Sequence, residues 1–465
     1  MSGFSLITDQ DIIKGFCTDS SNYPGHAEAL IRPKSTAEVS EILKEANSKK
    51  IPVTAIGNRS SLTGSAAAEG GWILDTSQMT KIIEINQGEK FALAEPGMML
   101  SDFKKTILDE GLFYAPDPTS EKECFFGGSI ATNASGSRTF KYGSTKKYVR
   151  ALEVVLASGE ILNIRRLNIE KNTFGYLPFQ NMVDIFVGSE GTLGIITKAE
   201  VELLVKPENF FGGMAFFKTL SECLDFVVNV RKNLINQTPT ITPRAVELFD
   251  HLGLDIIRPD SPFKIPANAK AAIFFEQEYT SDSNNGCEAL LNNWLSFLES
   301  NKALVDDTII AEQAKQQEEL RRLRHKVPSS LFEEGGKYTK EGGGKISTDW
   351  SVPINRIHEI IDFAKKLKEE ARIEDPVIYG HIGNGHPHYN FISKNAEQKK
   401  QILEVVHKTC KRVITLGGTI AAEHGIGKIK KDFMKYQYPE SIIKSMKSLK
   451  QSLDPNNILA PGNIF

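Results

Sequence analysis

The sequence predicts an α+β protein built from two domains. The chain has 465 residues, and a single domain commonly contains about 100–200. Strand and helix patterns alternate through the first ~205 residues, and their connections are rich in glycine. A second run of strands and helices starts at Phe210. Because prolines commonly mark boundaries, the Pro-flanked stretch at 205–207 divides the chain into expected domains 1–205 and 206–465.

The first predicted element is an amphipathic helix over residues 35–50. Ser35 and Glu38 have the spacing of a capping box, which marks a helix start. Four apolar residues that follow share one helical face: Val39, Ile42, Leu43 and Ala46. Strands are expected at residues 51–56, 72–74, 82–85, 91–94 and 185–187. Two apolar runs between residues 151 and 164 flank Ser158 and Gly159, which is the spacing of a β-hairpin.

The second domain is also expected to mix strands and helices. Strands are expected at 210–217, 271–275, 377–379 and 389–391. Helices are expected at 221–234, 311–324, 353–371 and 397–416. The helix at 311–324 is rich in charge and is expected to end at Arg324, just before Val327 and Pro328.

The composition is that of an ordinary globular protein, with 40% hydrophobic residues, 25% charged residues and a mean hydropathy of −0.26. The net charge of −2 offers no general attraction to nucleic acid or anionic membrane, although it leaves room for a local basic patch. Five scattered cysteines without a CxxC pair favour a reducing cytoplasm. No apolar run approaches the ~20 residues of a membrane span, and no signal peptide is visible. We therefore expect a cytoplasmic protein without a nucleic-acid partner or a transmembrane segment; peripheral membrane association stays open.

Three glycine-rich segments lie in the first domain, at residues 57–64, 127–137 and 188–196. In the first, backbone N–H groups and the hydroxyls of Ser60, Ser61 and Thr63 could cradle a phosphate. It matches neither the P-loop nor the GxGxxG motif, so a polar surface turn is the competing interpretation. The second has almost no bulky side chain, so it is either a linker or a backbone that approaches a large flat partner.

Five of the nine histidines lie between His381 and His424. If the strands at 377–379 and 389–391 pair as a hairpin, His381 and His388 face one another across its mouth, close enough to share a metal. Glu423 and His424 follow in a second glycine-flanked segment. Two imidazoles and a carboxylate suit a divalent transition metal with open positions for substrate. A structural role for the histidines is the competing interpretation.

Four strings of the sequence are shared with a known family: PDPTS at 116–120, GGSIATNASGSRTFKYG at 127–143, GSEGTLGIIT at 188–197, and LDP…PG within 453–462. They resemble the vanillyl-alcohol-oxidase-type flavoproteins, in the branch with D-lactate dehydrogenase, the flavin subunit of glycolate oxidase and D-2-hydroxyglutarate dehydrogenase. The resemblance covers nearly the whole chain. It implies a two-part FAD-binding domain of the p-cresol methylhydroxylase (PCMH) type and an α+β substrate (cap) domain with an antiparallel sheet. It also implies that the last ~35 residues return to the FAD-binding domain.

The resemblance further implies that the three glycine-rich segments hold FAD. A covalent flavin link is not expected in the first segment, which contains no His or Cys. The residues that take this role by resemblance are Gly57, Ser60, Ser61, Leu62, Gly64, Pro118, Gly128, Thr132, Asn133, Gly136, Gly191 and Ile195. Relatives usually have more glycine where Asn58 and Arg59 stand. Arg59 therefore either pairs with phosphate or points to water.

By the same resemblance His381, His388 and Glu423 hold a divalent metal, with zinc, manganese or iron as the candidates. His424 takes the role of catalytic base. The family usually has Asn where His386 stands, so His386 is an extra ligand, a neighbour of the ligands or a solvent-facing residue.

Three further residues bear on the substrate. Arg324 occupies the place where relatives carry an arginine for the substrate carboxylate, since a guanidinium offers a planar double donor. It also stands in a charge run that could simply be solvated. Asn390 resembles a family substrate contact and shares a strand face with His388. Ser347 stands where 2-hydroxyglutarate enzymes have a lysine, which disfavours a dicarboxylate.

Taken together, the resemblance implies FAD-dependent oxidation of a D-2-hydroxy acid, D-lactate-like or glycolate-like, to the 2-oxo acid. Hydride would pass from C2 to flavin N5 while His424 takes the hydroxyl proton. The electron acceptor stays open among a quinone, a cytochrome and an electron-transfer flavoprotein, and so does a homodimer. Two other classes remain: an ether-lipid synthase similar to alkyl-dihydroxyacetonephosphate synthase, and a flavin-binding partner subunit without turnover. Neither would need the histidine–glutamate constellation.

Overall fold

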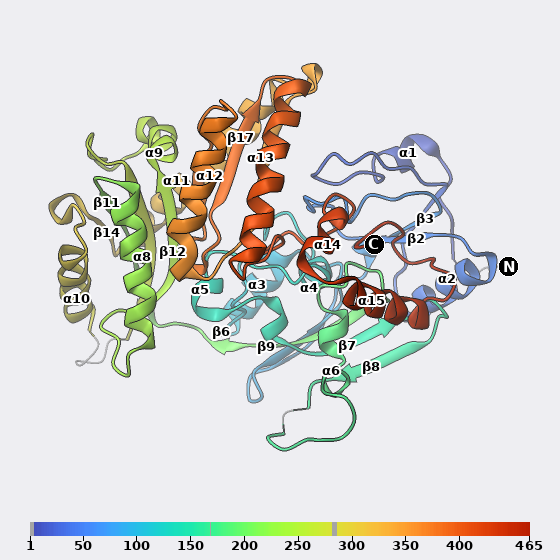
Figure 1. Ribbon diagram of the computed structural model, residues 1–465. Helices are drawn as coiled ribbons and strands as arrows, with labels where there is room; N and C mark the ends of the chain where they lie inside the picture. Colours follow the sequence, from blue (N-terminus) through green and yellow to red (C-terminus); the bar gives the residue numbers. More distant parts are fainter. Residues whose placement is uncertain (1–3, 168, 281–285) are drawn as a thin grey trace. The chain divides into compact units, whose positions relative to one another are not determined.

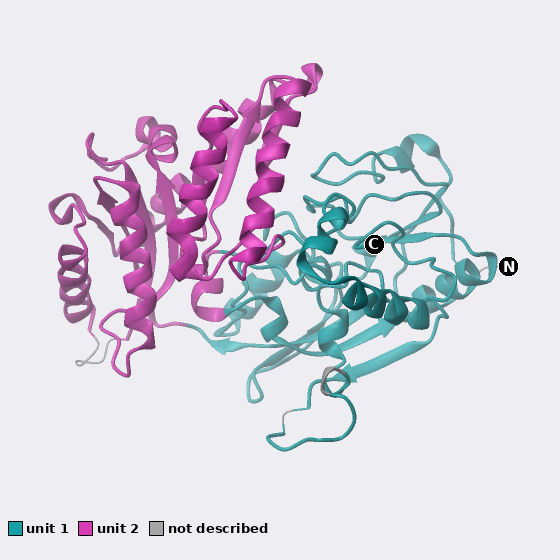
Figure 2. Cartoon of the chain, in the orientation of Figure 1, with its two compact units in different colours: residues 1–136, 143–206, 423–465 teal, residues 137–142, 207–422 magenta. Residues whose placement is uncertain are grey.

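The computed structural model describes residues 4–167, 169–280 and 286–465. The described strands form four sheets (Figure 1). The chain divides into two units (Figure 2). Unit 1 comprises residues up to 136, residues 143–206 and residues 423–465, and unit 2 comprises residues 137–142 and 207–422.

Unit 1 begins with a parallel three-stranded sheet in the order β1–β3–β2. Its strands are β1 (Ala29–Ile31), β2 (Val53–Ile56) and β3 (Trp72–Asp75). Helix α2 (Thr36–Lys49) crosses from β1 to β2 and is the helix expected from the sequence. Its predicted apolar face is fully buried. The Ser35 hydroxyl accepts from Glu38 N as a capping box requires, but the Glu38 carboxylate accepts from Lys34 N rather than from Ser35 N.

The second sheet of unit 1 is antiparallel, in the order β4–β5–β9–β7–β8. Its strands are β4 (Ile82–Asn86), β5 (Phe91–Ala94), β7 (Val149–Val155), β8 (Ile161–Arg165) and β9 (Ile195–Glu202). The predicted hairpin is confirmed, because β7 pairs with β8 and Gly159 turns with φ +81°. The predicted strand at 185–187 is wrong. Residues 185 and 186 belong to α7 (Val183–Phe186) and Val187 is its C-cap; Val183 and Phe186 are buried three residues apart, a helical spacing.

Shorter elements complete unit 1. The helices are α1 (Gln10–Lys14), α3 (Leu100–Asp109), α4 (Phe126–Ala131), α6 (Leu177–Gln180), α14 (Met434–Gln437) and α15 (Glu440–Leu453). Strands β6 (Leu112–Phe113) and β10 (Leu204–Val205) form a two-stranded sheet.

Unit 2 contains an antiparallel seven-stranded sheet in the order β14–β11–β13–β12–β16–β17–β15. Its strands are β11 (Asn209–Phe217), β12 (Pro243–Asp250), β13 (Ala271–Tyr279), β14 (Ile309–Ala311), β15 (Gly344–Ser347), β16 (Val377–Gly380) and β17 (His388–Ser393). The short helix α5 (Thr139–Tyr142) also belongs to this unit.

Helices cover both faces of this sheet. One hydrophobic core lies under α8 (Leu220–Ile235), α10 (Cys287–Ser300), α12 (Ile357–Glu370) and α13 (Ala396–Thr415). Figure 1 shows α8, α12 and α13 side by side over this face. A second core lies under α9 (His251–Ile257) and α11 (Ala314–Gly336).

Helix α11 is longer than the sequence predicts. It was expected to end at Arg324, but it continues to Gly336 with Pro328 inside it. A proline removes one helical hydrogen bond. Leu323, Val327 and Leu331 are nevertheless buried at four-residue spacing in the core under α11, and this packing holds the helix together through the proline.

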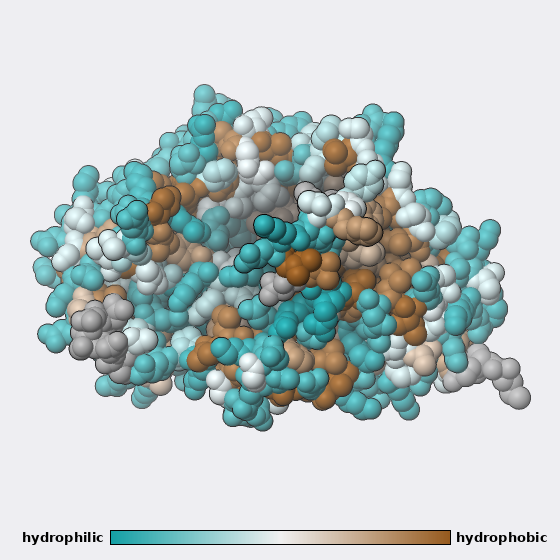
Figure 3. All heavy atoms as spheres, turned by 90° about the horizontal axis from the view of Figure 1, so that it is seen from below, coloured by the Kyte–Doolittle hydropathy of each residue, from teal (hydrophilic) through white to brown (hydrophobic). Residues whose placement is uncertain are grey.

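Within the described residues, none of the helices combines the length and the apolar composition needed to cross a lipid bilayer. On the face drawn in Figure 3, hydrophobic side chains form separate patches among hydrophilic ones.

Candidate active site

The second and third glycine-rich segments of unit 1 are joined by backbone hydrogen bonds. Gly188 N donates to Ile130 O at 3.1 Å, and Glu190 N donates to Ala131 O at 2.9 Å. Glu190 adopts a left-handed conformation with φ +53°, as does Asn133 with φ +50°. Such conformations are uncommon outside glycine and commonly accompany a functional constraint.

The returning segment of unit 1 is tied to the first and third glycine-rich segments. The buried Glu190 carboxylate accepts from Ile426 N and Gly427 N, both at 2.7 Å. Burial raises the pKa of Glu190, and the two amide bonds only partly offset that effect. The Thr63 hydroxyl donates to His424 O at 3.3 Å. Unit 1 therefore holds the backbone of His424 beside two of its glycine-rich segments.

Gly427 shows why this junction needs glycine. Its φ is +53°, and a Cβ there would lie 2.2 Å from the Thr63 carbonyl oxygen. Only a residue without a side chain fits so close to another backbone.

The backbone of the glycine-rich segments leaves room for a flat cofactor. A Cβ built at Gly128 would meet nothing within 4 Å, and one at Gly191 would meet only Ala460 at 3.9 Å. The neighbouring Thr132 hydroxyl donates to Gly128 O. A Cβ at Gly136 would instead collide with the Asp117 backbone, so the 116–120 string adjoins the second segment. These features fit an extended ligand such as FAD.

The remaining residues assigned to FAD by resemblance differ in their surroundings. In the first segment Ser60 and Ser61 are half-buried, Leu62 is exposed and Gly64 turns with φ +75°. The Ser61 hydroxyl accepts from Ser65 at 2.8 Å. The side chain of Ile195 is 3% exposed and belongs to the core under α2, so it offers at most its backbone to a ligand.

Arg59 contacts groups of unit 1, and its pairing with a phosphate stays a prediction. Its guanidinium donates to Gly15 O and lies over the Phe16 ring, 4.8 Å from the centroid. Arg59 therefore anchors the first glycine-rich segment to the region after α1.

Three histidines gather at the end of the β16–β17 hairpin in unit 2. The two strands pair antiparallel, which confirms the hairpin. His381 follows β16, His386 lies in the connection and His388 begins β17. All three are buried, and their ring centroids lie 4.5, 5.4 and 5.6 Å apart. Burial excludes the solvent-facing alternative for His386.

Each of these imidazoles has its Nδ1 atom beside an oxygen. The acceptors are the Glu247 carboxylate for His381 (2.8 Å), the Trp350 carbonyl for His386 (2.6 Å) and the Thr348 carbonyl for His388 (3.2 Å). An oxygen partner assigns the proton to Nδ1, so Nε2 keeps its lone pair in the neutral ring. Metal-binding histidines commonly have this arrangement. Nε2 of His386 lies 3.5 Å from the Asp349 carboxylate.

Glu247 binds both His381 and Arg324, a role that the sequence analysis missed. One carboxylate oxygen accepts from Arg324 Nε at 2.8 Å and lies 2.8 Å from Nη2 in the ion pair, and the other faces His381. Burial alone would raise the pKa of Glu247, but Arg324 and then His381 outweigh it and lower the pKa to about 2. The sequence signal is a carboxylate, Glu247, between two apolar residues in the middle of strand β12.

Asn390 contributes an unsatisfied acceptor near the histidines. Its side chain is 1% exposed, and Nδ2 donates to the carbonyls of His388 and Val377. Oδ1 is buried without a hydrogen-bond partner among the described residues. Because a buried orphan acceptor is costly, it points to a donor or a cation supplied by a ligand. The donor set therefore fits a divalent metal with a hydroxylated substrate.

A second buried ion cluster lies on β13. The Glu276 carboxylate accepts from Arg138 Nε at 3.0 Å and from Arg244 Nε at 2.7 Å, and Arg321 Nε lies 3.8 Å away. Burial opposes ionisation of Glu276, but the guanidiniums hold its pKa far below the usual range. The β12 ladder shifts register between Pro243 and Ala245, at Arg244. Such a bulge re-aims a side chain, and no sequence pattern announced it.

Two family models match the chain. The model described as FAD linked oxidases, C-terminal domain, matches residues 206–464, and the model described as FAD binding domain matches residues 27–165.

Three curated relatives match almost end to end. The glycolate oxidase subunit GlcD of Bacillus subtilis is 31% identical, covering 95% of this chain and 90% of the relative. The D-lactate dehydrogenase of Anaerostipes hadrus is 28% identical, covering 99% and 94%. The D-2-hydroxyglutarate dehydrogenase of Stutzerimonas stutzeri is 26% identical, covering 99% and 96%.

Solved structures share the fold. p-Cresol methylhydroxylase with substrate bound gives a TM-score of 0.73 at 18% identity, covering 99% of this chain and 93% of that chain. An alkyldihydroxyacetonephosphate synthase gives 0.72 at 18% identity, covering 98% and 82%. The predicted α+β fold with a PCMH-type FAD-binding domain is thereby confirmed.

Proposed function

The chain belongs to the FAD-linked oxidases, and from that premise we propose that it oxidises a D-2-hydroxy acid to the 2-oxo acid with the help of a divalent metal. The observation that carries the proposal is the buried imidazole cluster, in which an oxygen atom faces each of the three Nδ1 atoms, as is common for metal-binding histidines. The relatives named for glycolate, D-lactate and D-2-hydroxyglutarate support the substrate class.

In this proposal His381 and His388 bind the metal through Nε2, and Glu423 adds a carboxylate. The support for Glu423 is its place in the chain. Ala422 N donates to Asp349 O at 2.9 Å, beside the imidazole cluster of unit 2. A trans peptide bond puts the Cα of Glu423 about 3.8 Å from that of Ala422. When bound, FAD supplies the hydride acceptor and the metal supplies Lewis acidity.

The protein's own groups bind the substrate and move its proton. His424 accepts the hydroxyl proton as general base. Asn390 Oδ1 would find its missing partner in the cation or in another donor group of the bound ligand, since the single hydroxyl proton goes to His424. Arg324 binds the substrate carboxylate with N–H groups that do not face Glu247, since a guanidinium has five. Glu247 acts as a positioning residue for both Arg324 and His381.

Anaerobic addition of candidate acids to the purified yellow protein tests the proposal. D-Lactate, glycolate, D-2-hydroxyglutarate and larger D-2-hydroxy acids are added separately while the absorbance of oxidised flavin is followed. Ser347 favours a monocarboxylate substrate. The dicarboxylate is included because the arginines around Glu276 could bind a second carboxylate. We expect at least one acid to bleach the flavin. If none does while the protein holds metal, the proposal is wrong.

His424→Gln tests the base. The substitution should leave flavin content unchanged and slow flavin reduction by about 10²–10⁴. His358→Gln is the matched control, because His358 lies on α12 and pairs with the exposed Asp225. Equal reduction rates in the two variants would remove His424 from the role of base.

A further inference from the structure

Positive charge is concentrated near the end of unit 1. Residues 428–450 contain seven lysines and two acidic residues, whereas the whole chain has a net charge of −2. Lys428 and Lys450 are buried and hydrogen-bonded inside the unit. The other five lysines lie at least partly on the surface, along α14, α15 and the turn before them.

Three of these lysines line one pocket and outnumber its single acidic side chain. Lys431, Lys435 and Lys447 have no ion pair with a carboxylate among the residues that the structure describes. Many lysines elsewhere on the surface do have one, for instance Lys104 with Glu121 and Lys368 with Asp375. Asp432 is the only acidic side chain among the residues that line the pocket. The lining side chains therefore carry a net positive charge. An anionic partner would neutralise this charge.

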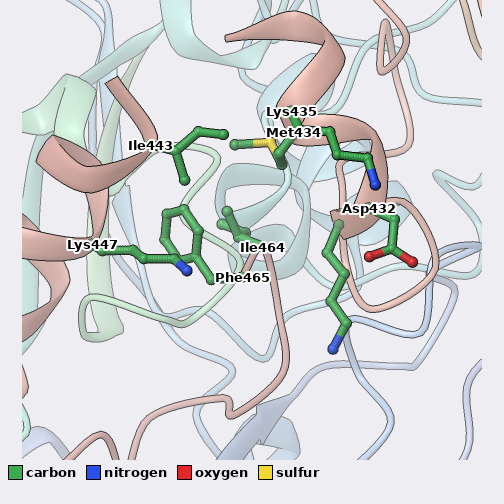
Figure 4. Close-up of a pocket in the computed structure, with 8 residues that line it drawn as sticks. Asp432, Met434, Lys435, Ile443, Lys447, Ile464 and Phe465 are labelled. Carbon is green, nitrogen blue, oxygen red and sulfur yellow. The ribbon is translucent and has the colours of Figure 1, made fainter. Parts of the chain in front are cut away.

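The same pocket has a volume of about 250 Å³, and four of its eight lining residues are apolar. Figure 4 shows Met434, Ile443, Ile464 and Phe465 gathered around it, with Lys447 beside the Phe465 ring. The volume equals roughly eight waters at ~30 Å³ each. The four apolar side chains give an aliphatic chain a surface to pack against beside the lysines.

Exposed aliphatic side chains accompany the lysines. Ile429 is 48% exposed and Ile442 on α15 is 43% exposed. Tyr438, 39% exposed, lies between α14 and α15. Lysines with aliphatic and aromatic side chains on one short amphipathic stretch are typical of segments that lie in a membrane interface.

We propose that this basic surface, made by Ile429, Lys431, Lys435, Ile442 and Lys447 with their pocket, docks onto an anionic phospholipid bilayer. The lysines attract the phosphate headgroups, the isoleucines enter the interface, and the pocket receives an acyl segment. A phospholipid supplies an anion and an aliphatic chain in one molecule, which an acidic protein surface does not. The inference does not depend on the proposed oxidation.

Flotation of the FAD-loaded full chain with vesicles tests it. One set of vesicles contains phosphatidylcholine alone, and the other also contains phosphatidylglycerol. We expect the protein to float only with the anionic vesicles and to be released by high salt. The triple variant K431Q/K435Q/K447Q should lower partitioning about 100-fold, since each lysine near an anionic surface contributes roughly fivefold. K340Q/K399Q/K400Q is the control with the same charge change on exposed lysines of unit 2, and it should bind like the unmodified chain.

Two further arms separate a bilayer from an acidic protein partner. Ile442→Ser should lower partitioning roughly tenfold, because its side chain no longer enters the interface. Soluble polyglutamate should compete only weakly. Equal flotation with both kinds of vesicle, or equal loss in the two triple variants, would overturn the proposal. Tight polyglutamate binding with no effect of Ile442→Ser would also overturn it and assign the surface to an acidic protein. Flavin content shows whether each variant is folded.

Discussion

Glu247→Gln is the sharpest test of the site, because the substitution keeps the shape of the side chain and removes only its charge. The wild-type carboxylate accepts hydrogen bonds from Arg324 Nε and from His381 Nδ1, both at 2.8 Å, and Arg324 Nη2 lies 2.8 Å from it. Glutamine offers one oxygen acceptor and one NH₂ donor. If the oxygen faces Arg324, the NH₂ group faces His381 Nδ1. That imidazole must then carry its proton on Nε2, which blocks the lone pair needed by a metal.

Two magnitudes follow for Glu247→Gln. Removing one partner of a buried ion pair costs about 3–5 kcal/mol, so the free energy of unfolding should fall by about that amount. Loss of a group that orients a metal-binding histidine costs about 10–100-fold in metal affinity. Chemical denaturation of the metal-free protein measures the first quantity. Competition with a chromogenic zinc chelator measures the second.

Glu276→Gln is the matched control. Glu276 is as buried as Glu247 and holds two arginines, but no imidazole contacts it. We expect a similar loss of stability and a zinc affinity within about twofold of the unmodified chain. The reasoning would be refuted if Glu247→Gln and Glu276→Gln changed zinc affinity equally, or if Glu247→Gln left it unchanged.

Three other predictions concern stability and cofactor binding. Burial raises the pKa of Asp250 to about 7, more than the amides of Gly253 and Ile378 lower it. Its contribution to stability is therefore full below its unfolded pKa near 4 and is lost as the pH rises through 7, by up to about 4 kcal/mol. Denaturation across this range should show that the free energy of unfolding depends less on pH in Asp250→Asn than in the unmodified chain. Parallel pH profiles of the two proteins would contradict the assignment. Gly427→Ala should weaken FAD binding, because the new Cβ would collide with the Thr63 carbonyl oxygen. Flavin release on dilution measures this effect. Gly175→Ala, at an open turn that also has a positive φ, is the control and should retain FAD. Pro328→Ala should raise the free energy of unfolding by about 1–3 kcal/mol in urea titration if α11 runs through this position, and leave it unchanged if the helix stops at Arg324.

Local patterns predicted most of the secondary structure. The helix after Ser35, the hairpin around Gly159 and the hairpin around the histidines depend on neighbours in sequence, and all three are confirmed. The strand expected at 185–187 failed because three apolar residues in a row fit a buried strand or a helical turn equally well. The end of α11 was misplaced because a proline was given more weight than the apolar spacing around it.

The partners of the candidate site could not be predicted in the same way, because they come from distant parts of the chain. Glu247 lies 134 residues before His381, and the sheet brings them together. The partner of Arg59 was likewise not predictable from local sequence. Its hydrogen bond to Gly15 O depends on the fold of unit 1 and not on the glycine-rich segment itself. Sequence patterns identify groups able to do chemistry, whereas the atoms that orient them become visible only in three dimensions.

Arg324 shows why that orientation matters for function. The sequence supported equally a solvated arginine and a carboxylate receptor, but its side chain is 9% exposed and paired with Glu247. A guanidinium held by a buried carboxylate loses little further conformational entropy when a second carboxylate binds. Glu247 also partly neutralises the positive charge that would attract that second carboxylate. If Arg324 binds substrate, Glu247 therefore fixes the geometry of the contact and weakens its electrostatic attraction. Because lysine cannot reproduce that geometry, Arg324→Lys should raise KM for the reactive acid far more than it changes flavin content.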